Sequence, residues 1–140
     1  MRYASEQLDR IYERTSGHCH LCHKKLAFKN YGRFGERASW EVEHSVPRAR
    51  SGTDHLNNLY PACIPCNRSK RDRGTRSMRA RNGQSRAPLS ASARRKAKHL
   101  HAVGGGMLGA IAGSTLGPVG AWIGAAIGAK LGHDSNPDHG

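Results

Sequence analysis

The chain has 140 residues and a formal net charge of +13, because 23 Lys and Arg residues outnumber 10 Asp and Glu residues. Only 6% of the residues are aromatic, which excludes a large hydrophobic core that could stabilise the fold alone. Most of the excess charge lies in residues 68–98, which hold 12 basic residues and 1 acidic residue. A basic block of this kind favours an anionic partner, such as a phosphate backbone.

The N-terminal segment 5–15 predicts a short amphipathic helix. Ser5 is the expected N-cap and Gly17 the expected stop. The apolar residues that repeat at helical spacing are Leu8, Ile11 and Tyr12.

All four cysteines occur in two C-x-x-C pairs, a spacing that lets two thiolates of each pair bind one tetrahedral Zn²⁺. Two disulfides are the alternative, but the first residues, MRYASEQLDR, lack the apolar run of a secretory signal. We therefore expect a cytoplasmic location and favour structural zinc over disulfides. A thioredoxin-like dithiol would need a βαβ pattern, which the sequence lacks. The expected zinc ligands are Cys19, Cys22, Cys63 and Cys66.

Three histidines flank the first cysteine pair, namely His18, His20 and His23. Because four sulfurs already satisfy a zinc ion, we expect these histidines to be solvated turn residues.

The segment between the cysteine pairs has 40 residues, more than a plain zinc ribbon needs. Residues 29–38 contain two glycines and mixed charge, which predicts a surface loop. Alternation from Trp40 predicts a strand that ends near Pro47. Residues 48–58 are polar and predict a loop, after which an extended stretch from Leu59 leads into the second cysteine pair.

A short helix is expected after the second pair, with Asn67 near its N-terminus and Gly74 at its end. Residues 75–98 carry six arginines and two lysines without an acid, which predicts a mobile basic linker.

Glycine recurs at every fourth position in two runs of the C-terminal segment. The runs are Gly105, Gly109, Gly113 and Gly117, then Gly120, Gly124, Gly128 and Gly132. On a helix such a row lets a second helix approach closely, as in membrane helix pairs. The tail is open to several interpretations: one kinked membrane span, a shallow helical hairpin, a soluble self-packing element, or a flexible tail in water. Residues 102–132 are thus a candidate for association with a membrane or anionic lipid and for self-association.

The string WEVEHSVPRARSGTDHLNNLYPACIPCNRSK combines Glu43-His44, Asn58-Leu59 and a Cys-Asn-x-x-Lys element in one order. In these elements the sequence resembles the HNH endonucleases, the ββα-metal nucleases, in the subgroup held by two C-x-x-C knuckles. The resemblance covers residues 17–72. It implies a small α+β fold, a zinc-stapled ββα-metal core, here followed by a basic linker and a Gly/Ala-rich helical tail. The family more often has Asp at position 43, and the last motif letter is Asn67 rather than His.

The resemblance, together with the composition of the rest of the chain, predicts four segments. They are an HNH nuclease domain (1–74), a basic linker (75–101), a glycine-zipper-like apolar segment (102–133) and a disordered tail (134–140).

The same residues suit phosphodiester hydrolysis. An imidazole that titrates near neutral pH makes His44 the expected general base. Glu43 and Asn67 are the ligands that the resemblance implies for a catalytic cation, and their oxygen atoms suit Mg²⁺ or Mn²⁺. Asn58 is expected to fix the loop facing His44, with Asn57 as the alternative. The expected nucleic-acid contacts are Arg68, Lys70, Arg71 and Arg73.

Each assignment has a structural alternative. His44 could be an ordinary hydrogen-bonded histidine, Asn67 a helix N-cap, and the basic segment a solubilising tail; His55 is expected to be exposed. The leading hypothesis is a metal-dependent HNH endonuclease that hydrolyses DNA. The alternatives are a non-catalytic zinc-knuckle protein that binds nucleic acid and a membrane-associating nuclease toxin.

Overall fold

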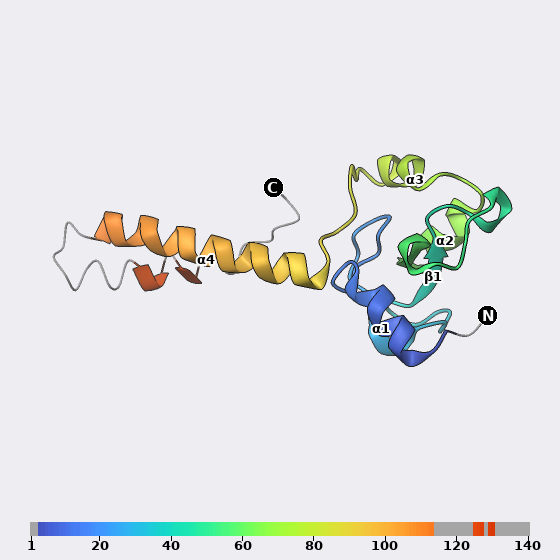
Figure 1. The fold of residues 1–140 in the computed structure, drawn as a ribbon, viewed down its shortest axis with the longest axis horizontal. Coiled ribbons are helices and arrows are strands. Elements are labelled where there is room, and N and C mark those ends of the chain that lie inside the picture. Colours follow the sequence, from blue (N-terminus) through green and yellow to red (C-terminus); the bar gives the residue numbers. More distant parts are fainter. Residues whose placement is uncertain (1–2, 114–124, 128, 131–140) are drawn as a thin grey trace. The chain divides into compact units, whose positions relative to one another are not determined.

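A computed structural model describes residues 3–113, 125–127 and 129–130 (Figure 1). The chain divides into two compact units, residues 1–91 and 92–140. The helices and strands of the first unit are α1 (Ser5–Glu13), β1 (Trp40–His44), β2 (Leu59–Cys63), α2 (Ile64–Lys70) and α3 (Thr75–Arg81). The predicted small α+β fold is confirmed.

Strands β1 and β2 form a two-stranded antiparallel sheet in which Trp40 pairs with Cys63 and His44 with Leu59. Helix α2 follows β2 without a loop, because Cys63 ends the strand and is also the N-cap of the helix. Side chains alternate along β1, so Glu41 and Glu43 share the face that contacts α2. The hairpin and α2 together form a ββα unit.

Helix α1 covers the other side of the core. Ile11 is fully buried, and the Tyr12 ring packs against Trp40 with ring centroids 5.4 Å apart. Gly17 ends the segment as predicted: its φ is +69°, and a Cβ there would collide with the Tyr12 ring. The N-cap, however, is Ala4 rather than the predicted Ser5.

Helix α3 extends the first unit beyond the predicted boundary at Gly74. Met78 is only 4% exposed and belongs to the core cluster. The Arg79 Nε donates a hydrogen bond to the His20 carbonyl at 2.8 Å, and Thr75 Oγ1 donates to the Ser45 carbonyl. The prediction of a mobile linker is therefore wrong for residues 75–81, because one apolar side chain in a basic run anchors them.

The second unit contains most of α4 (Ala91–Gly113). Three of the glycines that recur at every fourth position lie on this helix: Gly105, Gly109 and Gly113. The other five repeat glycines and the predicted tail over residues 134–140 lie outside the described residues. No helix in the part of the chain that the structure describes is long and apolar enough to cross a membrane.

Candidate active site

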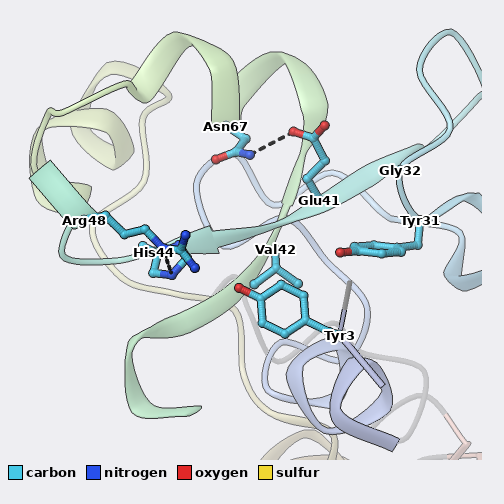
Figure 2. A pocket seen from close by; sticks show the side chains of 8 residues that line it. All are labelled: Tyr3, Tyr31, Gly32, Glu41, Val42, His44, Arg48 and Asn67. Atoms are coloured by element: carbon cyan, nitrogen blue, oxygen red, sulfur yellow. Dashed lines mark hydrogen bonds between the residues drawn. The ribbon is translucent and has the colours of Figure 1, made fainter. Parts of the chain in front are cut away.

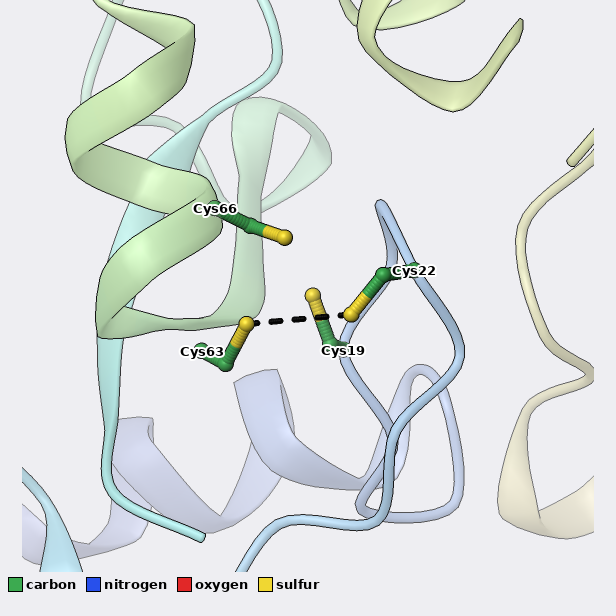
Figure 3. A group of neighbouring side chains, drawn as sticks. All are labelled: Cys19, Cys22, Cys63 and Cys66. Atoms are coloured by element: carbon green, nitrogen blue, oxygen red, sulfur yellow. Dashed lines mark hydrogen bonds between the residues drawn. The ribbon is translucent and has the colours of Figure 1, made fainter. Parts of the chain in front are cut away.

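The four cysteines of the two pairs converge on one point (Figure 3). Their sulfur atoms all lie within 4.8 Å of one another, and Cys22 Sγ is 3.7 Å from Cys63 Sγ. A tetrahedral zinc ion with Zn–S bonds of about 2.3 Å requires sulfurs about 3.8 Å apart, so the cluster fits structural zinc. A disulfide would need about 2.05 Å, and all four cysteines are free.

The first cysteine pair is shaped by a tight turn. The His23 amide donates to the Cys19 carbonyl at 2.9 Å, and His23 itself adopts a left-handed φ of 63°. The Leu21 amide points at Cys19 Sγ from 3.4 Å, a donor that stabilises a thiolate. The turn therefore presents both sulfurs of the pair to the N-terminus of α2, where the second pair lies.

A buried charge network lies beside the zinc site. Glu43 is 3% exposed and uses both carboxylate oxygens: Oε1 lies 2.6 Å from Lys70 Nζ and Oε2 lies 2.5 Å from His20 Nε2. Lys70, itself 1% exposed, also donates to the His44 carbonyl at 2.9 Å. The network thus joins the first cysteine turn, β1 and α2 behind the backbone of His44.

Burial and pairing set the charges in this network. Burial lowers the pKa of His20, which keeps its imidazole neutral. Burial alone would raise the pKa of Glu43, but its contacts with His20 and Lys70 outweigh burial and lower that pKa. In a neutral His20 that accepts at Nδ1 from Arg79, 3.2 Å away, the ring hydrogen lies on Nε2, the atom in contact with Glu43.

Three expectations change because of this network. His20 is fully buried, so the prediction that it is a solvated turn residue is wrong. Lys70 is removed from the expected phosphate contacts, because its ammonium is enclosed and already paired. Glu43 likewise faces a lysine and a histidine rather than open solvent.

Breaking the buried pair should destabilise the protein strongly. Glu43→Gln leaves the Lys70 ammonium buried without its counter-charge, and we expect a loss of about 3–5 kcal/mol in the free energy of unfolding. Denaturant unfolding of the zinc-loaded protein measures it. Glu36→Gln, at an exposed loop position, is the matched control and should stay within about 0.5 kcal/mol of the parent. Equal stability of the two variants would contradict the role of the network.

Figure 2 shows the open pocket of the site, which is lined by residues of β1 and α2, the strand and helix that also carry Glu43 and Lys70. It has a volume of about 590 Å³ and is lined by Tyr3, Tyr31, Gly32, Glu41, Val42, His44, Arg48 and Asn67. Asn67 Nδ2 donates to Glu41 Oε2 at 2.9 Å. The structure therefore brings two of the predicted site residues, His44 and Asn67, to one pocket, together with Glu41 rather than Glu43.

His44 is held by an acidic partner that the sequence analysis did not single out. Its Nε2 lies 2.7 Å from Asp54 Oδ1 and 3.2 Å from Arg48 Nε, and Arg48 also donates to Asp54 at 2.6 Å. Two tautomers are compatible with these contacts: Nε2 donates to Asp54, which can only accept, or Nε2 accepts from Arg48 Nε. Hydrogen bonds from His44 and then Arg48 lower the pKa of Asp54, which keeps it ionised.

Asn58 braces the loop that follows His44. Its Oδ1 accepts from the Val46 amide at 2.6 Å, while its Nδ2 donates to the carbonyls of Val46 and Thr53. Gly52 is needed in the same loop, since a Cβ there would lie 1.8 Å from the Val46 carbonyl oxygen. These contacts are the ones that a loop-fixing residue would make.

The alternative residue at this place, Asn57, is exposed, and its backbone amide donates to His55 Nδ1 at 3.3 Å. His55 is exposed, as predicted.

The other three expected nucleic-acid contacts gather in one place. With Ser69 and Arg81 they line a hollow of about 450 Å³; its basic members are Arg68, Arg71, Arg73 and Arg81. Arg68 also lies 3.7 Å from Glu41, which links this hollow to the pocket of His44. We name it the arginine hollow.

A ββα unit stapled by a four-cysteine metal site, with a histidine at the end of its first strand, defines the class of domain. Residues 19–73 match the family model described as HNH endonuclease. The chain therefore contains an HNH endonuclease domain, which runs from the first cysteine to just beyond α2. No curated protein and no solved structure matches the chain significantly.

Proposed function

We propose that the domain is a metal-dependent endonuclease that hydrolyses phosphodiester bonds of DNA, with His44 as the general base. The HNH match supports nuclease activity on nucleic acid. The observation that carries the proposal further is the shared pocket, in which an imidazole, a carboxylate and an amide oxygen face one space. A protein that only binds nucleic acid would need no such combination.

His44 is arranged to accept a proton. In the tautomer whose Nε2 donates to Asp54, the shorter of its two contacts, the lone pair of the ring lies on Nδ1, where it can take a proton from an attacking water. The ionised Asp54 then lies next to the imidazolium that forms and stabilises it. Asn58 and Lys70 act on the backbone around His44 and hold the strand end in place.

Glu41 and Asn67 are the residues that would hold the catalytic cation. One carboxylate and one amide oxygen, half-buried at a pocket edge, suit Mg²⁺ or Mn²⁺, which keep most of their ligand shell as water and phosphate. Such an ion would neutralise a phosphate oxygen and stabilise the leaving 3′-oxygen. The resemblance implied Glu43 for this role, but that carboxylate is occupied by Lys70 and His20.

Measurements of metal binding distinguish the role of Glu41 from that of Glu43. Glu41→Gln is expected to weaken Mn²⁺ binding by at least about tenfold, because it removes the only charged ligand of the proposed pair. Mn²⁺ titration followed by electron paramagnetic resonance measures this on the zinc-loaded protein, with Glu36→Gln as the control. If Glu43→Gln, while folded, weakens Mn²⁺ binding and Glu41→Gln does not, the assignment to Glu41 is overturned.

The arginine hollow is proposed to bind the phosphate backbone beside the pocket. Replacing Arg71, Arg73 and Arg81 by alanine should lower the slope of log affinity against log salt by about 1 for each phosphate that these side chains neutralise. Binding of a short DNA duplex at several salt concentrations gives the slope. Arg10→Ala, which removes an exposed charge from α1, should leave it unchanged. An unaltered slope in the triple variant would refute this role.

The proposal as a whole is tested by the nicking of supercoiled plasmid with the purified full chain, in zinc-loaded form. Nicking that requires added Mg²⁺ or Mn²⁺ supports the endonuclease. Tight DNA binding without nicking at any metal concentration would favour the non-catalytic nucleic-acid-binding protein instead.

A further inference from the structure

The loop before β1 displays an aromatic side chain that the catalytic scheme does not use. Phe34 is 73% exposed, the highest value among the large hydrophobic residues described. It is not isolated, since the guanidinium carbon of Arg68 lies 4.5 Å from the centroid of its ring. A cation at this distance from a ring is a favourable contact that fixes how the ring faces solvent.

The loop that carries Phe34 is fastened at its base. The Gly32 amide donates to the Trp40 carbonyl at 2.8 Å, and the buried Asn30 side chain donates to the Arg37 carbonyl at 2.7 Å. Gly32 and Gly35, which bracket Phe34, both have positive φ values that suit glycine. The backbone is thus turned outward at Phe34 by fixed contacts, instead of folding the ring into the core.

Through its contact with Arg68, Phe34 lies next to both the pocket of His44 and the arginine hollow. Its partner Arg68 lies 3.7 Å from Glu41, which lines the pocket with His44. Arg68 also lines the arginine hollow. A strand whose phosphates follow the arginines into the pocket would therefore bring its bases close to the ring.

We propose that Phe34, backed by Arg68, is a stacking site for an unpaired nucleobase next to the phosphate in the pocket. This inference rests on the proposed function, and it assigns to the site a preference for single-stranded nucleotides. In a duplex the faces of the bases are covered by their neighbours, whereas an unpaired base offers a free face. Stacking of a base on an aromatic ring tolerates any base, because every base has a π-face.

The test compares the binding of one DNA sequence as a single strand and as a duplex. Fluorescence anisotropy without added divalent cation, on the zinc-loaded full chain, keeps the DNA intact. Phe34→Ala is expected to weaken single-strand binding by about tenfold and duplex binding by less than about twofold. Phe34→Trp should retain the affinity of the parent, and Phe34→Leu, which is apolar but has no ring, should behave like Phe34→Ala.

A charge control and a stacking readout complete the experiment. Arg33→Ala, on the same loop, should weaken both forms of DNA equally. Fluorescence of 2-aminopurine placed in the single strand should be quenched by the parent and less by Phe34→Leu. Equal single-strand binding by the parent and Phe34→Ala, or full affinity in Phe34→Leu, would overturn the stacking site. Absence of plasmid nicking by the parent would count against the proposed hydrolysis alone, because the binding comparison does not depend on cleavage.

Discussion

Replacing His44 by alanine is expected to reduce metal-dependent nicking of plasmid DNA by about 10²- to 10⁴-fold. The variant removes the imidazole that is proposed to take the proton from water, and it leaves Asp54 with Arg48 as its remaining partner. It should not unfold the domain, because the contact that ties this position to Lys70 uses the His44 backbone carbonyl. Initial nicking rates at saturating Mg²⁺ or Mn²⁺ measure the effect.

His55 provides the matched control for this experiment, since it is an exposed histidine in the loop that Asn58 braces. His55→Ala should nick at the rate of the parent. Asp54→Asn should fall between the two variants, because it keeps the base but removes the negative charge that stabilises its protonated form. A His44→Ala variant that is folded, holds zinc and nicks at the parental rate would contradict the assignment of the base.

Removal of zinc is expected to unfold the first unit. Structural zinc contributes about 10–16 kcal/mol of apparent binding free energy in small zinc domains, which is as large as the whole stability of a typical domain. The four sulfurs here join the turn at Cys19 to the start of α2, and the core between them is small. Circular dichroism during titration with a strong zinc chelator should show loss of helix and of cooperative thermal unfolding.

Measuring the zinc content of two variants distinguishes zinc ligands from residues that only lie near the zinc site. Cys63→Ser should lose the zinc ion that the parent holds at one per chain. His23→Asn should keep it, because asparagine accepts the left-handed backbone at this position and the four sulfurs suffice as ligands. A chelated protein that keeps its fold and its melting temperature would contradict the structural role of zinc.

Local patterns in the sequence predicted the parts of the fold that depend on near neighbours. The helix of residues 5–15, the strand from Trp40 and the cysteine pairs each follow from spacing or composition within a few residues. Helix α3 did not, because its arginines suggested a linker. One buried methionine, Met78, outweighs that composition once a core is present to receive it.

Local sequence patterns could not predict which of Glu41 and Glu43 lines the pocket. Both side chains lie on the same face of β1, so alternation along the strand cannot distinguish them. The difference comes from packing: His20, in the first cysteine turn, and Lys70, on α2, enclose one carboxylate and leave the other at the pocket. These contacts join residues that are far apart in the sequence, so no local sequence pattern predicts them.

Asp54 was missed for a related reason. It lies in a polar loop whose composition predicts exposure, and its partnership with His44 depends on the path that Asn58 and Gly52 impose on that loop. The sequence did contain one signal for this partnership: Asp54 lies ten residues after the candidate base His44, in a loop that returns to it.

The most direct test of the central claim is a metal titration of the zinc-loaded parent protein on supercoiled plasmid. We predict no nicking with structural zinc alone and a rate that rises to saturation as Mg²⁺ or Mn²⁺ is added, since the proposed hydrolytic cation and the structural ion are assigned to different sites. Intact plasmid at every concentration of both metals, with a folded protein that binds the DNA, would contradict the proposal that this domain is an endonuclease.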